Sequence, residues 1–377
     1  FHRVTRRVQV PRWLLCVLRV VTQAMVAPTR IAAVEAGGTS WVVAIAEGDP
    51  TNIVERADFP TTTPEETLGH VVAWLKDKTF DCLGVASFGP IDLHTSSPKF
   101  GFITTTPKPF WTNADILGPL RKGLGLPEDY PIGFETDVNA PAMAEYSSAL
   151  DQGQAMESCA YVTVGTGVGI GLVFGGHPVH GLLHGEGGHI SVPQYPGDTW
   201  EGKKTLNCPG WFELESMVNS AALAGRAGCE IPALKDLPDE HPVWDTAAHY
   251  LAAMCANLIL TASPQKIVLS GGVMLRSILF PKIRAKTQEY LNNYIDVPEV
   301  TTDLIEKVIV PSEHGNRAGI VGALYISRGT LSAKKSSSSV QVLGHTLCPG
   351  AISGILAVLG VGALLGATVV GMAARKP

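Results

Sequence analysis

The sequence ETDVNA (135–140) places the carboxylate of Asp137 where it could act on a hydroxyl group. Asp137 lies between an apolar run, YPIGF (130–134), and a segment of helical composition at 138–148. A carboxylate at such a junction can face a cleft and accept the proton of a hydroxyl nucleophile. Aspartate is also a favoured helix cap, so the motif by itself leaves both roles open.

Three glycine-rich turns interrupt apolar strand patterns. The stretch YVTVGTGVGIGLVFGG (161–176) has six glycines and no charged residue, and the other turns are EAGGTS (35–40) and SGGV (270–273). Glycine lets backbone amides approach a polyphosphate closely, although one such turn alone can be a bulge or tight packing. Three turns together predict a nucleotide held from several sides. None fits GxxxxGK[ST], and the GxG pattern does not open a helix, so Walker-type and dinucleotide-binding folds are excluded.

From residue 30 onward, strand patterns alternate with amphipathic helical ones, which is typical of α/β proteins. We expect one hairpin over 31–50 and another over 161–176, each with a glycine turn. Thr63 and Pro64 mark the start of a helix at 63–78. Two such hairpins predict two similar lobes with a cleft between them. The other expected elements are strands at 82–90 and 266–272 and helices at 140–150, 245–262 and 315–328.

Composition limits the class of protein. The chain has 377 residues, of which 45% are apolar and 17% charged, enough for two domains with their own cores. The net charge of -5 gives no reason to expect nucleic acid as a partner. The seven cysteines are scattered and form no CxxC pair, so a reducing compartment fits better than a disulfide framework.

The two ends differ from the middle. Residues 1–34 contain arginines but no acid, and the first methionine is Met25. This lead resembles a transit peptide, and untranslated sequence ahead of a start at Met25 is the open alternative. At the other end, 351–374 is a 24-residue segment without a charge, long enough as a helix to cross the roughly 30 Å hydrocarbon layer. The alternative for this segment is a helix buried in protein.

Six short motifs occur in order along the chain: EAGGTS (35–40), SFGP (87–90), ETDVNA (135–140), GTGVGIG (165–171), EGGH (186–189) and SGGV (270–273). With them, residues 30–328 resemble the ROK sugar kinases, and most closely the ROK-type fructokinases. The resemblance implies an α/β protein with the two-lobed actin/hexokinase-like (ribonuclease H-like) ATPase fold, to which the sequence adds a C-terminal transmembrane helix. The expected parts are an extension at 1–29, an N-terminal lobe at 30–137, a C-terminal lobe at 138–314, a closing helix of the N-terminal lobe at 315–330, a linker at 331–350 and a membrane-spanning tail at 351–374.

The resemblance implies an ATP-dependent hexose kinase that converts D-fructose to fructose 6-phosphate, with Asp137 as the general base. Glucokinase or mannokinase activity is the alternative within the family, and a non-catalytic, membrane-tethered sugar-binding scaffold is the alternative of another class. A sugar-sensing transcriptional regulator would need a helix-turn-helix before the core, and the 29 residues ahead of it show none. The resemblance also allows a homodimer, and the tail predicts a cytosol-facing catalytic domain tethered to a membrane.

By resemblance, the motif residues fall into three groups. The ATP-phosphate group is Gly37, Gly38, Thr39, Gly165, Thr166, Gly167 and Gly169; the adenosine group is Gly271 and Gly272; and the sugar group is Gly89, Pro90, Asn139, Glu186 and His189. Ser40 stands where fructokinases of this type usually have lysine, a change that can weaken a phosphate contact.

The cofactors implied are ATP and Mg²⁺. Glu35 would hold the Mg²⁺ through water, since this ion keeps several waters and bridges phosphate oxygens. Related kinases place a structural zinc after the histidine of this motif. Structural zinc wants four ligands, and only His189 and Cys208 are in place, so no structural zinc is expected.

Overall fold

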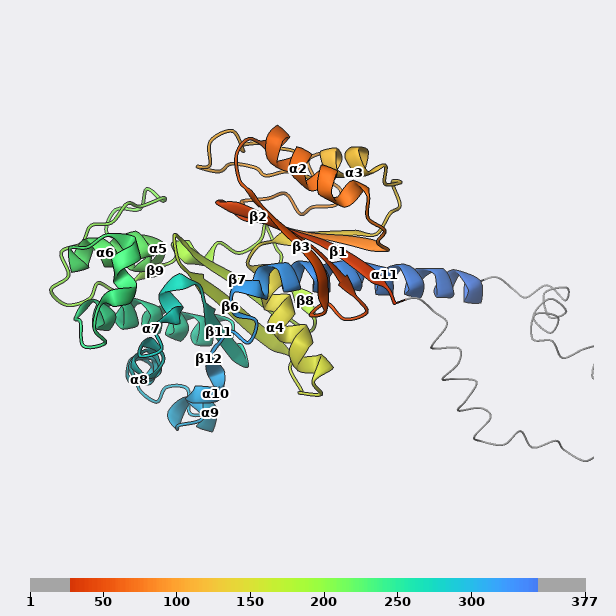
Figure 1. Cartoon of the computed structure of the whole chain (residues 1–377). Helices are drawn as coiled ribbons and strands as arrows, with labels where there is room; N and C mark the ends of the chain where they lie inside the picture. The colour runs from red at the N-terminus through yellow and green to blue at the C-terminus, as the bar shows by residue number, and fades with distance from the viewer. Residues whose placement is uncertain (1–27, 345–377) are drawn as a thin grey trace, which may run out of the picture. The chain divides into compact units, whose positions relative to one another are not determined.

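The computed structural model describes residues 28–344, and within them two five-stranded sheets share one topology. The strand order is β3-β2-β1-β4-β5 in the first sheet and β8-β7-β6-β11-β12 in the second. In each sheet, three consecutive antiparallel strands are extended by two parallel strands that follow later in the chain. The repeated topology confirms the expectation of two similar α/β lobes, each beginning with a glycine-turned hairpin (Figure 1).

The first sheet is most buried at its parallel strands. Every residue of β4 is buried because this strand lies between β1 and β5, whereas exposure alternates along β3 because it forms the edge. The strands are β1 (Arg30–Ala36), β2 (Ser40–Glu47), β3 (Ile53–Pro60), β4 (Cys82–Ser87) and β5 (Ile132–Thr136).

The second sheet is built around β6 and β11, whose residues are mostly buried. Its strands are β6 (Ser158–Val164), β7 (Val168–Phe174), β8 (His177–Pro178), β11 (Lys266–Ser270) and β12 (Ile309–Pro311). A separate two-stranded ribbon pairs β9 (Ser191–Val192) with β10 (Phe212–Glu213).

Helices cover the sheets with apolar stripes. In α2 (Pro64–Lys76), Leu68, Val71 and Leu75 pack into the core of the first lobe, and the hydroxyl of Thr63 accepts a hydrogen bond from the Glu66 amide at 3.4 Å. This is the helix start that the sequence predicts. Figure 1 shows α2 and α3 (Leu117–Leu124) over one face of the first sheet, and the core of the second lobe unites its sheet with α7 (Val243–Thr261) and α8 (Leu279–Leu291).

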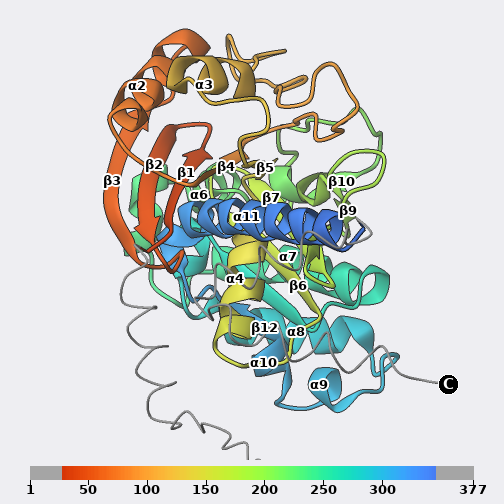
Figure 2. The same cartoon turned by 90° about the vertical axis from the view of Figure 1, so that its right-hand side faces the viewer.

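Two further helices lie on the inner faces of the sheets (Figures 1 and 2). The helix α4 (Asn139–Asp151) packs on β6 and β7, and the first turns of α11 (Ala318–Gly344) pack on β4 and β5. The two helices meet where Gly322 lies against the carbonyl of Ala140. The remaining helices are α5 (Leu214–Val218), α6 (Ser220–Ala227), α9 (Pro298–Thr301) and α10 (Ile305–Val308), with short 3-10 turns at Gly187–His189, Ile231–Asp236, Gly272–Leu275 and Gly315–Arg317.

The prediction of a membrane-spanning helix is wrong, because no helix within residues 28–344 is both long and apolar enough to cross a bilayer. The helix α7 is apolar because it is buried in the core of the second lobe, and it also carries Asp245 and His249. The membrane partner and the membrane-tethered location depended on the predicted helix and are corrected with it. The segment 351–374 and the extension at 1–27 lie outside the described residues.

The domain boundaries derived from the sequence stay predictions. Both sheets belong to one compact unit that ends at Thr330, and the chain from Leu331 onward is a second unit.

We predict that Gly171→Ala lowers the free energy of unfolding by at least about 1–3 kcal/mol, measured by urea denaturation. Gly171 faces the start of α4, and a Cβ atom there would lie 2.1 Å from the carbonyl oxygen of Val138. Gly69→Ala is the matched control, since Gly69 is exposed on α2 with nothing within 4 Å of an added Cβ. The control should stabilise the protein by about 0.5–1 kcal/mol, and equal effects of the two changes would contradict the prediction.

Candidate active site

The predicted motifs lie at the carboxyl ends of parallel strands. In the first sheet β1, β4 and β5 run parallel, so Gly38, Gly89 and Asp137, which follow them, lie along one edge. In the second sheet β6 and β11 run parallel and lead into Gly165 and Gly271. Ligands of open α/β sheets bind at such edges.

A cavity of about 560 Å³ connects these edges. It brings together most of the residues predicted for catalysis, phosphate binding and sugar binding. The predicted residues that line it are Gly38, Thr39, Gly89, Asp137, Gly165, Thr166, Gly167, Gly169, Glu186 and His189. Residues from both lobes thus face one volume, as the two-lobe interpretation of the sequence requires.

Three predicted residues near this cavity do not line it. Gly37 lies behind the first turn, where its amide donates to the Ser40 carbonyl and its carbonyl accepts from Thr61. Pro90 lies beyond Gly89, with its carbonyl accepting from the Thr104 amide at 2.7 Å. Asn139 is buried, and its side chain donates to Glu135 Oε1 at 2.9 Å and accepts from the Leu172 amide at 3.0 Å.

Asp137 and Glu35 form an acidic centre in which the charged form of each is disfavoured. Burial raises the pKa of Asp137 to about 7, with a further contribution from the charge of Glu186. Burial likewise raises the pKa of Glu35 to about 7, and the charge of Asp137 adds to it. Two acids with raised pKa values beside a cavity are typical of a functional site.

Glu35 is placed at the start of α11. The backbone amide of Ile320 hydrogen bonds to its carboxylate, and Gly319 permits this contact, since a Cβ there would lie 2.0 Å from Glu35 Oε1. Magnesium is bound in proteins through one or two carboxylates, with water and substrate phosphates completing its shell. A partly buried carboxylate beside Asp137 fits that ion.

The part of the cavity that is lined by Glu186 and His189 also contains a histidine that the motifs did not identify. The backbone amide of Ile91 donates to His184 Nε2 at 3.0 Å, so the proton of the neutral ring is on Nδ1. That nitrogen lies 3.3 Å from Glu186 Oε1. His184 is buried and lines the cavity beside Glu186, and its Nδ1 also lies 3.4 Å from the Gly185 carbonyl oxygen.

Two more cavity residues escaped the sequence analysis. Lys108 lines the cavity, and its ammonium has no hydrogen-bond or ion-pair partner among the described residues. Lys108 lies between two prolines in TTTPKPFW (104–111), but a lone lysine in a loop does not by itself predict a ligand-binding residue. Glu215 accepts a hydrogen bond from the Val168 amide at 2.9 Å and so closes the second glycine turn. Glu215 is 47 positions from Val168 in the sequence, so no local motif indicates that the two are in contact.

A second cavity of about 600 Å³ adjoins the first through Ser220. Ser220 lines it, and both its amide and its hydroxyl donate to the Gly165 carbonyl at 2.8 Å. Gly272, predicted to contact adenosine, lines this cavity together with Trp244. Gly271 lies behind it, against Val164.

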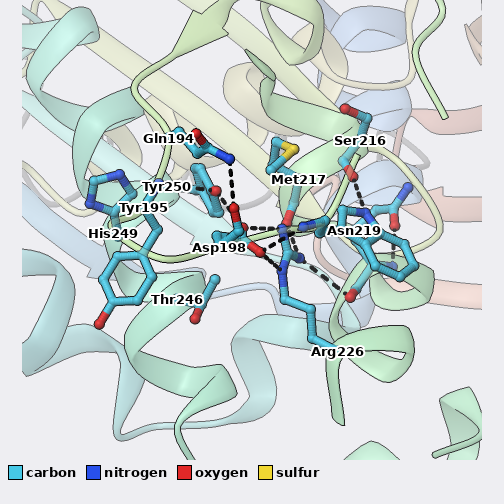
Figure 3. A network of polar contacts seen from close by, with 12 residues as sticks. Gln194, Tyr195, Asp198, Ser216, Met217, Asn219, Arg226, Thr246, His249 and Tyr250 are labelled. Atoms are coloured by element: carbon cyan, nitrogen blue, oxygen red, sulfur yellow. Dashed lines mark hydrogen bonds and ion pairs between the residues drawn. The ribbon is translucent and has the colours of Figure 1, made fainter. Parts of the chain in front are cut away.

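The loop between β9 and β10 is fastened by a buried ion pair (Figure 3). Asp198 accepts from Arg226 Nε at 3.0 Å and Nη2 at 2.7 Å, and from the Tyr250 hydroxyl at 2.6 Å. Arg226 also donates to the carbonyl of Met217 at 2.6 Å. Burial raises the pKa of Asp198, but the hydrogen bonds from Arg226, Tyr250 and the Trp200 amide outweigh it, so the pKa lies below its usual value.

The residues of this loop do not fit a structural zinc of the kind that related kinases have after this histidine. Within residues 28–344 there is no group of three or more His, Cys, Asp or Glu side chains suited to a metal ion. Nδ1 of His189 contacts Glu213 Oε1 instead.

Comparisons with known proteins agree on one family. A model of the ROK family matches residues 31–330. A fructokinase of Pediococcus pentosaceus is 38% identical over 302 residues, covering 80% of this chain and 98% of that protein. Two solved structures share the fold. A ROK hexokinase from Thermus thermophilus superposes with a TM-score of 0.62 and 22% sequence identity, covering 81% of this chain and 100% of its own. A ROK family glucokinase from Streptomyces griseus, in complex with glucose and AMPPNP, superposes with a TM-score of 0.59 and 20% identity, covering 80% of this chain and 99% of its own.

Replacing Arg226 by Met is expected to lower the free energy of unfolding by about 3–5 kcal/mol, because it leaves a buried carboxylate without its charge partner. Asp198 and Arg226 have side chains only 6% and 11% exposed. The control is Lys282→Met, whose partner Asp245 is 44% exposed, and which should cost about 0–1 kcal/mol. Thermal and urea unfolding measure both, and indistinguishable stabilities would refute the assignment.

Proposed function

The chain belongs to the ROK family of sugar kinases, and we propose that it transfers the γ-phosphoryl group of ATP to the 6-hydroxyl of D-fructose. The observation that supports this reaction is the 560 Å³ cavity, in which Asp137 shares one volume with both glycine turns and with Glu186 and His189. Phosphoryl transfer needs this combination of a proton acceptor, phosphate ligands and a positioned hydroxyl.

The sugar is held by groups that suit its hydroxyls. Glu186 accepts hydrogen bonds, and the free ring nitrogen of His189 completes the pair. The C6 hydroxyl oxygen attacks the γ-phosphorus in line, its proton passes to a carboxylate oxygen of Asp137, and the bond from the γ-phosphorus to the β–γ bridging oxygen breaks as ADP leaves.

ATP extends across both cavities in this proposal. Its adenosine occupies the cavity lined by Gly272 and Trp244, and its phosphates pass Gly165 and Gly167 toward Asp137. The amides of the glycine turns and Thr39 donate to the phosphate oxygens. Glu35 would hold Mg²⁺, and the ion would neutralise part of the phosphate charge.

Lys108 supplies the positive charge that the cavity otherwise lacks. Three carboxylates line the cavity, from Asp137, Glu186 and Glu215, and within the described residues Lys108 is its only lysine or arginine. A transferring phosphoryl group requires cationic neutralisation. Because Ser40 is not the lysine expected at its position, Lys108 is the residue that we assign to this role.

A coupled assay of ADP formation with fructose, mannose and glucose tests the function. We expect the highest kcat/KM with fructose, and Asp137→Asn should lower kcat by about 10²–10⁴-fold because the hydroxyl proton loses its acceptor. Fructose binding to the variant, measured calorimetrically, should be largely retained. A preference for glucose or mannose would reassign the substrate, and an active Asp137→Asn variant would exclude this base.

The pH dependence of kcat/KM follows from the raised pKa of Asp137. Only the ionised carboxylate accepts a proton, so activity should increase as pH rises through about 7 and fall below it. Glu186→Gln removes a charge that raises this pKa, so the acid limb should move to lower pH although the KM for fructose increases. A profile that is flat between about pH 5.5 and 8 would contradict Asp137 as the titrating base.

A further inference from the structure

The contact between His189 and Glu213 joins the sugar site to the β9–β10 ribbon. Glu213 is buried, and its Oε1 contacts Nδ1 of His189. Its other oxygen, Oε2, accepts a hydrogen bond from the backbone amide of Thr205 at 2.6 Å. Both oxygens of one carboxylate are therefore engaged by different segments of the chain.

This contact determines which nitrogen of His189 is available to a ligand. An ionised carboxylate can only accept, so Nδ1 of His189 carries the proton and donates it to Glu213. The other nitrogen, Nε2, is then an acceptor with no partner among the described residues, on a ring that lines the cavity. It can accept a hydrogen bond from a sugar hydroxyl.

A metal ion does not fit the same place. Nδ1 of His189 is occupied by Glu213, and residues 28–344 contain no cluster of three or more metal-ligating side chains. The loop is held instead by the Asp198–Arg226 pair, by the Tyr250 hydroxyl and by Trp200, whose indole nitrogen donates to the Ser216 carbonyl at 3.0 Å. These contacts fix the loop that carries Thr205.

We infer that Glu213 is the positioning residue of the sugar site, which fixes the ring and the proton of His189 without a metal so that Nε2 accepts from a hydroxyl of the sugar. The inference rests on the proposed function for the identity of the ligand. The carboxylate is specifically required, because it accepts from His189 and from Thr205 at once. A glutamine offers one acceptor oxygen, so either the His189 proton moves to Nε2 or the Thr205 amide loses its acceptor.

Kinetics of Glu213→Gln test the inference. We expect the KM for fructose to rise about 10-fold or more, with the KM for ATP unchanged and kcat altered much less. The matched background is His189→Gln, in which adding Glu213→Gln should have no further effect on the KM for fructose. An equal rise in both backgrounds, or an unchanged KM in the single variant, would overturn the inference.

The proton position is measured in the wild-type protein, which removes any dependence on the folding of the variant. Two-bond ¹⁵N–¹H spectra of histidine-labelled protein, assigned with His189→Gln, should show Nδ1 protonated and Nε2 bare. The opposite tautomer would refute the role of Glu213. If no sugar is phosphorylated, the proposed function fails, and the spectra still decide what Glu213 does.

Metal analysis tests whether zinc, and not Glu213, positions His189. After dialysis against 1,10-phenanthroline, with Mg²⁺ restored for the assay, the KM for fructose should be unchanged and zinc should be substoichiometric before treatment. Stoichiometric zinc whose removal raises this KM would show that a metal, and not Glu213, positions His189.

Discussion

Asn139 joins the two sheets, and the position of Asp137 depends on it. Its amide nitrogen donates to Glu135 in β5, its oxygen accepts from Leu172 in β7, and its backbone amide is bonded to the Thr136 hydroxyl. Asp137 lies inside this set of buried contacts. A buried side chain that donates to one sheet and accepts from the other favours one arrangement, because a shift would leave its Nδ2 or Oδ1 unpaired. The glycines of β7 allow the approach, since side chains there would collide with Val138.

The same packing determines the electrostatics of the site. Asp137 and Glu35 are brought together by strands from one sheet and by the start of α11. Burial raises both pKa values because it penalises the charged carboxylate. A base with a pKa near 7 still accepts a proton at neutral pH, and it holds that proton better than an ordinary aspartate. The acidic lining also explains why Lys108, whose ammonium has no partner within residues 28–344, belongs at this cavity.

The loop between β9 and β10 shows that one structural task has more than one solution. A metal site would order such a loop through four ligands. Here Asp198, Arg226 and Tyr250 form a compact network, and the guanidinium of Arg226 lies 5.4 Å from the ring centre of Trp200 and 5.5 Å from that of Tyr250. A buried ion pair of this kind is not a large source of net stability, but losing one partner is costly. Its value lies in holding one loop geometry next to His189.

The sequence by itself determined the α/β class, the two glycine-turned hairpins, the capped helix at 63–78 and the family, because these depend on local periodicity, capping and short motifs. It also indicated about half of the residues that line the cavity, among them Gly38, Gly89 and Asp137, which follow strands of the first sheet. It was wrong about the membrane helix, since no helix within residues 28–344 is both long and apolar enough to cross a bilayer. Only the tertiary structure decided that Asn139 joins the sheets, that Lys108, His184 and Glu215 face the cavity, and that Glu213 contacts His189. The contact between His189 and Glu213 joins residues 24 positions apart, and that between Ile91 and His184 joins residues 93 positions apart. No local pattern in the sequence encodes which distant side chains the packing of two sheets will bring together.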